Sequence, residues 1–262
     1  MLVCDVLESA GFANGFSTRI GGVSPMPKND LNLAGFDDDT AENIEENRQR
    51  FMTLFNDRYV LATAWQEHGD GVKIVDSTEA ALRSDERYDA LASNLAGVLV
   101  GVKTADCVPI LLGDKNRGAF AAIHAGWRGT ASKIIVKAIA AMNERFHTAP
   151  ADIVAAIGPA ACGRNYEIGE DVIRIFEDNF ESASDYLNET RPGHALIDLH
   201  AANRDQLMTA GVDPDQIFIS SLCTMERTDL FFSYRREKAR FGKTGRLLSV
   251  IGKLSGPSSD AG

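Results

Sequence analysis

The sequence contains a small set of side chains that can bind a metal ion or act as nucleophiles at neutral pH. Among five histidines and four cysteines, His68, Cys107 and His124 each lie where a short apolar run ends in a turn. Functional groups are commonly placed at strand ends, where a rigid sheet holds loop residues in fixed positions. Imidazole and thiolate are preferred zinc ligands, and three protein ligands leave a fourth position for water in a catalytic site. The pattern indicates an active site on these residues.

A metal is not the only chemistry that these side chains allow. Cys107 could instead be a nucleophile with His124 as its base, and both interpretations require the same side chains to lie close together. Each residue also has a plainer explanation, since a histidine at a strand end is often a hydrogen-bonded structural residue and a cysteine is often part of the core. The spacing alone leaves these alternatives open.

Two glycine-rich segments predict anion binding. The first, HAGWRGT, runs from His124 through two glycines to Thr130 and carries Arg128. Free N–H groups at a helix start attract anions. The second, STRIGG, carries Arg19. Neither segment has the spacing of a P-loop. We therefore expect Arg19 and Arg128 to hold a phosphate or carboxylate, the alternative being two solvated surface residues.

The remaining candidates are weaker. Cys162 lies in a glycine turn, where it either lines a cleft or packs, and Tyr234 and Arg235 either bind substrate or follow a core strand. The other histidines have no evident partner and are interpreted as structural; they are His147, His194 and His200.

The elements that must position these residues alternate between strands and helices. The expected strands span residues 16–19, 59–65, 72–75, 97–102, 108–112, 119–123, 153–157, 217–220, 231–234 and 247–251. The expected helices run from an Asp39 cap to about residue 55, onward from Thr130, and over 169–180 and 199–210. Continuously apolar strands predict a sheet that is buried on both faces. This order predicts a layered α/β or α+β sandwich with a mixed sheet.

Length and composition exclude several classes of protein. The chain has 262 residues and a net charge of -10, which makes nucleic acid and anionic membranes poor partners. We expect a single domain over residues 1–254 and a disordered tail over 255–262. The start shows no secretory signal and no segment is a membrane span, so with scattered cysteines we expect reduced thiols in the cytoplasm.

Several of these segments occur together in one known family. The chain resembles the YfiH family, also called the laccase-domain or multicopper polyphenol oxidoreductase family, over nearly its whole length. The motifs that carry the resemblance, in the family's order, are GFSTRIGGVS, WQEHG, YDAL, VGVKTADCVPILL, AAIHAGWRGT, AAIGPAACGRNYEIG and FFSYRRE. The family usually has Gln-Val-His-Gly around the first histidine, whereas Glu67 stands at the second position here. We expect the Glu67 side chain to point away from the site.

The resemblance implies a fold and a set of activities. It implies an α/β sandwich similar to that of a bacterial toxin deamidase, and zinc bound through His68, Cys107 and His124. It also implies phosphorolysis of adenosine, inosine and methylthioadenosine, together with adenosine deamination. Other activities assigned to the family are copper-dependent phenol oxidation and editing of peptidoglycan precursors. A multicopper centre needs many histidines, and five are too few, so phenol oxidation ranks low.

The expected function is therefore that of a cytoplasmic, zinc-dependent purine nucleoside enzyme, with copper as a possible alternative metal. Arg19 and Arg128 would hold phosphate, and Asp106 would act beside the metal ligands or in proton transfer. The expected partners are purine nucleosides and phosphate, with the protein a monomer or small homo-oligomer. The alternatives are a Cys107–His124 amidase acting on a cell-wall precursor and a protein that binds a metal or nucleoside without turnover.

Overall fold

The computed structural model describes residues 1–25, 30–34, 39–55 and 59–254. The predicted disordered tail, residues 255–262, lies outside the described residues. The helices are α1 Asp5–Ser9, α2 Ala41–Thr53, α3 Thr78–Leu82, α4 Trp127–Ala131, α5 Ile134–Phe146, α6 Glu170–Asn179, α7 Leu199–Thr209 and α8 Tyr234–Phe241. The strands are β1 Phe12–Phe16, β2 Ile20–Ser24, β3 Val60–Ala62, β4 Val72–Val75, β5 Ala90–Ser93, β6 Val98–Thr104, β7 Val108–Asp114, β8 Phe120–Ala125, β9 Ile153–Ile157, β10 Glu167–Gly169, β11 Leu187–Arg191, β12 His194–Ile197, β13 Ile217–Ile219 and β14 Leu247–Lys253.

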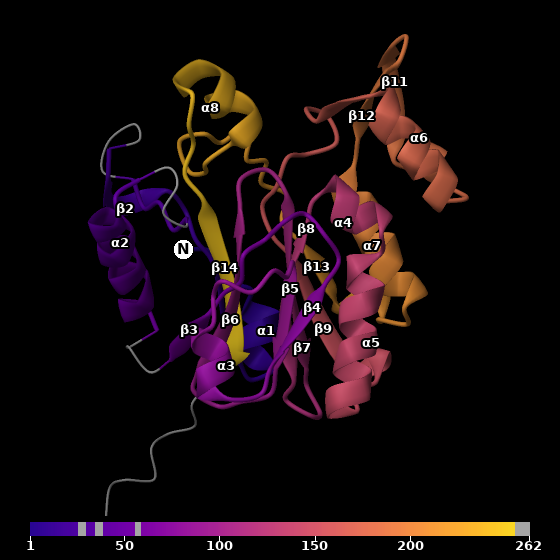
Figure 1. The fold of residues 1–262 in the computed structure, drawn as a ribbon. Helices are drawn as coiled ribbons and strands as arrows, with labels where there is room; N and C mark the ends of the chain where they lie inside the picture. Colours follow the sequence, from indigo (N-terminus) through magenta and orange to yellow (C-terminus); the bar gives the residue numbers. More distant parts are fainter. Residues whose placement is uncertain (26–29, 35–38, 56–58, 255–262) are drawn as a thin grey trace, which may run out of the picture.

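Two mixed sheets pack face to face at the centre of the molecule (Figure 1). One has the strand order β13-β9-β7-β8-β5-β4 and the other has the order β1-β14-β6-β3. Apolar side chains from both sheets fill the space between them, including Phe12 and Val100 from one sheet and Leu111 and Phe120 from the other. Burying each such side chain contributes about 1.5–3 kcal/mol, so this interface is a major source of stability.

Helices cover the outer faces of both sheets (Figure 1). The buried stripe of α5, which includes Ile135, Ala138 and Met142, packs with α7 against the six-stranded sheet. On the other side, Phe51 of α2 packs against the four-stranded sheet at Leu248. Both faces of each sheet are therefore buried, as the continuously apolar strands predict. The predicted mixed α/β sandwich is confirmed.

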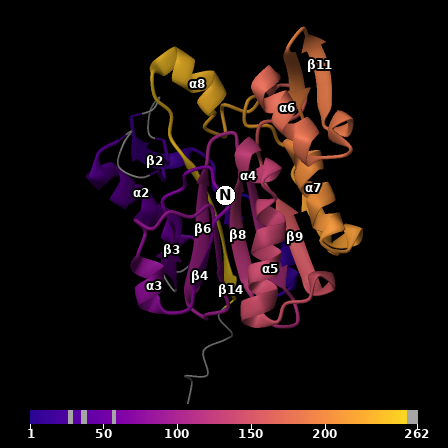
Figure 2. The ribbon, with the colours of Figure 1, turned by 45° about the vertical axis from the view of Figure 1, so that its right-hand side comes forward.

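A third, small sheet lies beside the sandwich and carries no predicted strand. Strands β10, β12 and β11 form an antiparallel sheet, and α6 packs next to it (Figure 2). All three strands are short, and β11 is polar and exposed along most of its length. Strands of three to five residues are too short to carry a clear period of two, so the sequence analysis predicts no strand here.

Four local predictions differ from the structure. The strand predicted at 16–19 overlaps β1 only at Phe16, and β2 begins only at Ile20, so residues 17–19 connect two strands instead. Thr40, not Asp39, caps α2, because the Thr40 hydroxyl accepts from the backbone N–H of Asn43 at 3.3 Å. The helix predicted from Thr130 is divided into α4 and α5, since Lys133 adopts a left-handed conformation between them with φ 60°. The described residues 231–234 do not form the predicted strand. Phe231 and Phe232 are buried there and lead directly into α8.

Candidate active site

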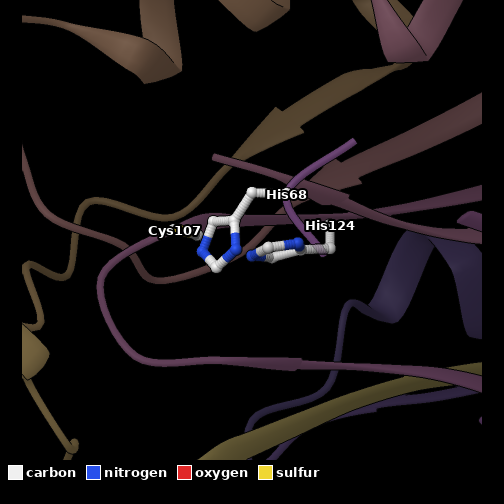
Figure 3. Close-up of side chains that lie close together, drawn as sticks. All are labelled: His68, Cys107 and His124. Atoms are coloured by element: carbon white, nitrogen blue, oxygen red, sulfur yellow. The ribbon is translucent and has the colours of Figure 1, made fainter. Parts of the chain in front are cut away.

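The three side chains proposed as ligands converge at one point of the structure. One ligand atom from each of His68, Cys107 and His124 lies within 4.8 Å of the other two. The two imidazole rings are arranged edge to face, with centroids 4.9 Å apart and an angle of 77° between the ring planes (Figure 3). His68 is exposed, Cys107 is partly buried and His124 is buried. One side of the site is therefore open to a ligand from outside.

Strand alternation explains why two of these residues face the same way. In β8, Phe120 and Ala122 point into the space between the sheets, so His124 points to the same side. Cys107 directly precedes β7 and lies an even number of positions from Leu111. It therefore points to the same side of the sheet as Leu111, which also lies between the sheets. Strands β7 and β8 pair with Val108 opposite Ala125, which brings the two functional residues to one end of the sheet interface.

A buried carboxylate that the sequence analysis did not identify organises the site. Asp89 lies directly before β5, beside His124, and its Oδ1 is 2.7 Å from Nδ1 of that histidine. The same carboxylate accepts hydrogen bonds from the backbone N–H groups of Glu67, His68 and Gly69 at 3.2, 3.0 and 2.7 Å. Asp89 therefore fixes one imidazole through its ring nitrogen and the other through its backbone. A histidine ligand that binds a metal through one nitrogen commonly donates the other to a carboxylate in this way.

The turn that carries His68 is held in a conformation that few residues adopt. His68 has φ 62°, in the left-handed region, which is uncommon for residues other than glycine, although asparagine, aspartate and histidine adopt it more often than the rest. The three hydrogen bonds to Asp89 stabilise this conformation. Glu67 points out of the site, as expected, and its carboxylate lies 3.3 Å from Arg87. This departure from the usual family motif therefore does not add a charge to the ligand set.

Without a metal, the electrostatics of the site favour an ion pair. Burial would raise the pKa of the Cys107 thiol, but the charge of His124 and hydrogen bonds from both histidines outweigh it and lower the pKa to about 6. Burial would lower the pKa of His124, yet Cys107 and Asp89 raise it to about 9. A thiolate and an imidazolium therefore coexist at neutral pH, and either a metal or a substrate meets an already ionised sulfur.

This ionisation predicts how fast Cys107 reacts in chelator-treated protein. Because its folded pKa lies near 6, the thiolate is populated above that pH, and the rate of iodoacetamide alkylation should rise through about pH 6. In the urea-unfolded chain, where His124 no longer faces the sulfur, the rise should move to about pH 8.5. Mass spectrometry of the Cys107 peptide measures both profiles. Identical profiles in the folded and unfolded chain would contradict this assignment.

The space around the three side chains fits a bound metal ion. Gly126, which follows β8, passes so close that a Cβ on it would lie 3.1 Å from Cys107 Sγ and 3.2 Å from His68 Cδ2. Two imidazoles and one thiolate form a donor set that suits zinc, and the Asp89 carboxylate supplies the outer partner that such ligands usually have. The residues present therefore fit a zinc-type ion.

The Gly126 contact gives a second prediction. Gly126→Ala should displace the thiol and the His68 ring by a few tenths of an ångström and lower metal affinity about 10- to 100-fold, as other disturbances of ligand orientation do. Gly69→Ala is the matched control, because its Cβ would meet nothing closer than 3.4 Å. Titration with a competing chelator measures both affinities, and an equal loss in the two variants would show that the close approach is unimportant.

Asp106 lies next to Cys107 but directs its carboxylate elsewhere. Its oxygens accept hydrogen bonds from Thr224 Oγ1 at 2.6 Å, Ser233 Oγ at 3.0 Å and the Arg235 backbone N–H at 2.7 Å. Burial raises the pKa of the Asp106 carboxyl, against the effect of these hydrogen bonds. Asp106 itself has φ 87°. These contacts indicate that it anchors the loop before Cys107, and its predicted role in proton transfer stays a prediction.

The two arginines predicted to hold phosphate differ sharply in their surroundings. Arg19 is buried and contacts Asp30 at 2.8 Å and Glu237 at 2.6 Å, and its guanidinium also donates to two backbone carbonyls. These carboxylates compete with any anion, so the structure favours a structural role for Arg19, tying the start of the chain to α8. Arg128 is exposed, with its guanidinium 4.1 Å from the Trp127 ring centroid. No carboxylate of the described residues forms an ion pair with Arg128.

Two further candidates lie near the site. The charge on Cys107 contributes, after burial, to raising the pKa of Tyr166 to about 12, which places this phenol in its vicinity. Arg235 stacks over the Tyr166 ring at 4.9 Å and donates to the Glu167 carbonyl at 2.7 Å. Tyr234 is half exposed at 48%. Arg235 is therefore close enough to line the approach to Cys107. The sequence analysis did not identify Tyr166 as a candidate.

The remaining histidines lie outside this cluster. His147 is exposed at the end of α5, His194 lies on β12, and His200 Nε2 is 3.1 Å from the Gly158 carbonyl. In the part of the chain that the structure describes, no candidate metal cluster contains any of them. The site therefore offers two histidines and one cysteine.

The fold and the site define a mixed α/β protein with a donor set of two histidines and one cysteine between stacked sheets. A family model described as multi-copper polyphenol oxidoreductase laccase matches residues 13–253, and the chain belongs to this family. It is similar to the protein named purine nucleoside phosphorylase of Bacteroides thetaiotaomicron, with 34% identity over 90% of this chain and 89% of that one. The protein of the same name from Deinococcus radiodurans is 37% identical over 90% of this chain and 87% of its own.

Solved structures show the same fold. The crystal structure of YlmD from Geobacillus stearothermophilus matches with a TM-score of 0.87 and 33% identity, covering 94% of this chain and 93% of that chain. The structure of YfiH from Bacillus licheniformis matches with a TM-score of 0.85 and 31% identity, over 92% of each chain. Among the described residues, no helix is both long and apolar enough to cross a membrane.

Proposed function

We propose that the protein is a zinc-dependent purine nucleoside enzyme, which cleaves adenosine, inosine and methylthioadenosine with phosphate and also deaminates adenosine. The observation that carries the proposal is the convergence of His68, Cys107 and His124 within 4.8 Å. The similarity to relatives named purine nucleoside phosphorylase supports the choice of substrate. The unpaired cysteines support a reducing compartment, and we place the reaction in the cytoplasm.

The two reactions can share one site. In phosphorolysis, a phosphate oxygen forms a bond to the anomeric carbon, the bond to the purine nitrogen breaks, and the free base leaves with a proton. In deamination, water adds to the purine carbon that bears the amino group, and ammonia leaves. A bound zinc supplies Lewis acidity for such polar oxygen chemistry. His68, Cys107 and His124 would hold it, while Asp89 keeps the His124 ring oriented.

The surrounding residues would bind and orient the reactants. We propose that Arg128 contacts phosphate, since its exposed guanidinium lies beside the strand end that carries His124. Helix α4 has five residues, so its dipole adds little to anion binding. We assign Asp106 to holding the loop before Cys107 through its contacts with Thr224 and Ser233.

The test uses the purified protein loaded with zinc. Inosine with phosphate should give hypoxanthine and ribose 1-phosphate, and adenosine should give adenine and inosine. Chelation should stop both reactions, and added zinc should restore them. Chromatography of the products measures each reaction separately. Absence of free base and of inosine with the metal-replete protein would overturn the proposal.

The role of Arg128 gives a third prediction. Arg128→Ala should raise KM for phosphate about 10-fold or more while changing KM for inosine little, because a lost charge-assisted contact is worth about 1.5–3 kcal/mol. Arg145→Ala is the matched control, since Arg145 is an exposed arginine at the end of α5, paired with Asp76. Initial rates at varied phosphate measure the effect. Equal KM values for phosphate in both variants would remove Arg128 from the site.

A specific observation also favours a second function, that of a Cys–His amidase acting on a cell-wall precursor. The lowered pKa of Cys107, with His124 held by Asp89 at 2.7 Å, resembles an activated nucleophile, its base and an orienting carboxylate. This function predicts an acyl-enzyme on Cys107 and activity that survives chelation. Loss of all turnover with chelator, reversed by zinc, would exclude it. Phenol oxidation is disfavoured, because the site gathers two histidines rather than the many that a multicopper centre needs.

A further inference from the structure

A second group of ligating side chains lies outside the site of His68, Cys107 and His124. One ligand atom from each of Cys162, Cys223 and Glu226 lies within 4.8 Å of the other two. Both cysteines are free thiols, Cys223 buried and Cys162 partly buried, while Glu226 is exposed. The cluster is therefore reachable from solvent on one side and closed on the other.

The three ligand atoms face a common point. The Asn165 side-chain nitrogen Nδ2 lies 3.2 Å from Cys162 Sγ, 3.8 Å from Cys223 Sγ and 2.7 Å from Glu226 Oε1. A single donor group that contacts all three acceptors shows that they converge, as ligands of one cation would. The sulfur of Cys162 is 3.8 Å from Glu226 Oε1, close to the spacing of two ligands on a tetrahedral ion with bonds of about 2.0–2.3 Å.

The neighbouring groups balance the charge that such a site requires. Arg164 contacts Glu226 through two hydrogen bonds of 2.6 Å each, which fixes the carboxylate and leaves further lone pairs on its oxygens. The backbone N–H of Cys162 donates to Cys223 Sγ at 3.3 Å. Two thiolates and one carboxylate carry three negative charges, so a divalent ion and the Arg164 guanidinium together bring the group to neutrality.

We propose that Cys162, Cys223 and Glu226 form a second metal site, which takes a thiophilic divalent ion such as zinc. On binding, both thiols release their protons to solvent, two metal–sulfur bonds and one metal–oxygen bond form, and the Asn165 NH₂ group turns away from the shared point. Water or the Asn165 amide oxygen completes the tetrahedron. The proposal is independent of the nucleoside chemistry at His68, Cys107 and His124.

The position of this site gives it a structural consequence. The Ala161 N–H donates to the Asp106 carbonyl at 2.9 Å, and Thr224 Oγ1 donates to the Asp106 carboxylate at 2.6 Å. Cys162 directly follows Ala161, and Cys223 directly precedes Thr224. A metal bound between the two cysteines would therefore join the two segments that anchor the loop leading to Cys107.

The first test uses the unmodified protein. Each thiol is alkylated under reducing conditions, with zinc or with chelator, and the cysteine peptides are quantified by mass spectrometry. Zinc should slow alkylation of Cys162 and Cys223 about 10-fold or more, since a coordinated thiolate is not free to react. Cys4, which belongs to no candidate metal cluster of the described residues, is the internal control and should react at the same rate in both conditions.

The second test counts metal ions. A His68→Asn/Cys107→Ala variant removes the first site, and equilibrium dialysis should still find about one zinc per chain in it. Adding Cys162→Ser/Cys223→Ser should abolish this binding, whereas adding Cys4→Ser should not. With Co²⁺ in place of zinc, the thiolate-to-cobalt charge-transfer absorption should follow the same pattern. Circular dichroism establishes that each variant is folded.

Two results would overturn the proposal. One is equal alkylation of Cys162 and Cys223 with zinc and with chelator in the unmodified protein. The other is a Cys162–Cys223 disulfide that forms readily in air while the reduced protein binds no metal at these residues, which would make the pair a thiol–disulfide couple instead. Because the first test reports on each cysteine separately, failure here is distinguishable from loss of the nucleoside activity.

Discussion

His68→Asn should abolish metal binding at the active site and lower the rate of nucleoside cleavage about 10³-fold. His68 supplies one of three ligand atoms that lie within 4.8 Å of one another. Metal catalysis is worth several kcal/mol of transition-state stabilisation, and about 1.4 kcal/mol corresponds to a factor of ten in rate. Asparagine tolerates the left-handed backbone of His68, at φ 62°, so the substitution removes the ligand without adding backbone strain.

The chain contains a closely matched control for this substitution. His147 is also exposed and also left-handed, with φ 58°, but belongs to no metal cluster of the described residues. His147→Asn should therefore retain metal and activity. Elemental analysis and product chromatography measure the two variants side by side. Full nucleoside cleavage by His68→Asn without bound metal would show that the reaction does not depend on a metal held by His68.

Asp89→Asn should lower zinc affinity about 10- to 100-fold and destabilise the fold by about 1–3 kcal/mol. The substitution replaces an oxygen that accepts hydrogen bonds with an NH₂ group that cannot, although Asp89 faces three backbone N–H groups and His124 Nδ1. Burial would raise the pKa of the Asp89 carboxyl, but His124 and the backbone donors outweigh it and lower the pKa. Because the folded pKa lies below the unfolded value of about 3.9, this stabilisation is complete above that pH and is lost as the pH falls through the folded pKa.

Asp70→Asn is the control for this prediction, because Asp70 lies in the same turn but is half exposed and pairs with Lys137 on the surface. It should change zinc affinity and unfolding little, since exposed ion pairs contribute about 0–1 kcal/mol. Chelator competition and urea unfolding at neutral pH measure both quantities, and urea unfolding repeated at pH values below about 3.9 follows the loss of the Asp89 stabilisation. If Asp70→Asn and Asp89→Asn behaved alike, Asp89 would not be the residue that orients the histidines.

The strongest local patterns in the sequence predicted the elements that form the core. The apolar runs over 108–112, 119–123 and 153–157 became β7, β8 and β9, because continuous apolar strands can be stable only where both faces are covered. The helical stripe from Ile134 became α5 for the same reason. Polar strands such as β11 and the helix break at Lys133 were not predicted, since packing rather than local pattern decides them.

The sequence by itself determined the candidate ligands, because histidine and cysteine side chains offer the nitrogen and sulfur donors, and motif order added the family. Tertiary structure alone decided which side chains meet. Asp89 reaches His124 through the pairing of β5 with β8, a contact between residues 35 positions apart that no local pattern encodes. The same long-range packing buried Arg19 in ion pairs, left Arg128 exposed, and brought Cys162 next to Cys223. Sequence spacing fixes only what lies along one strand or helix, whereas the stacking of the two sheets fixes what lies between them.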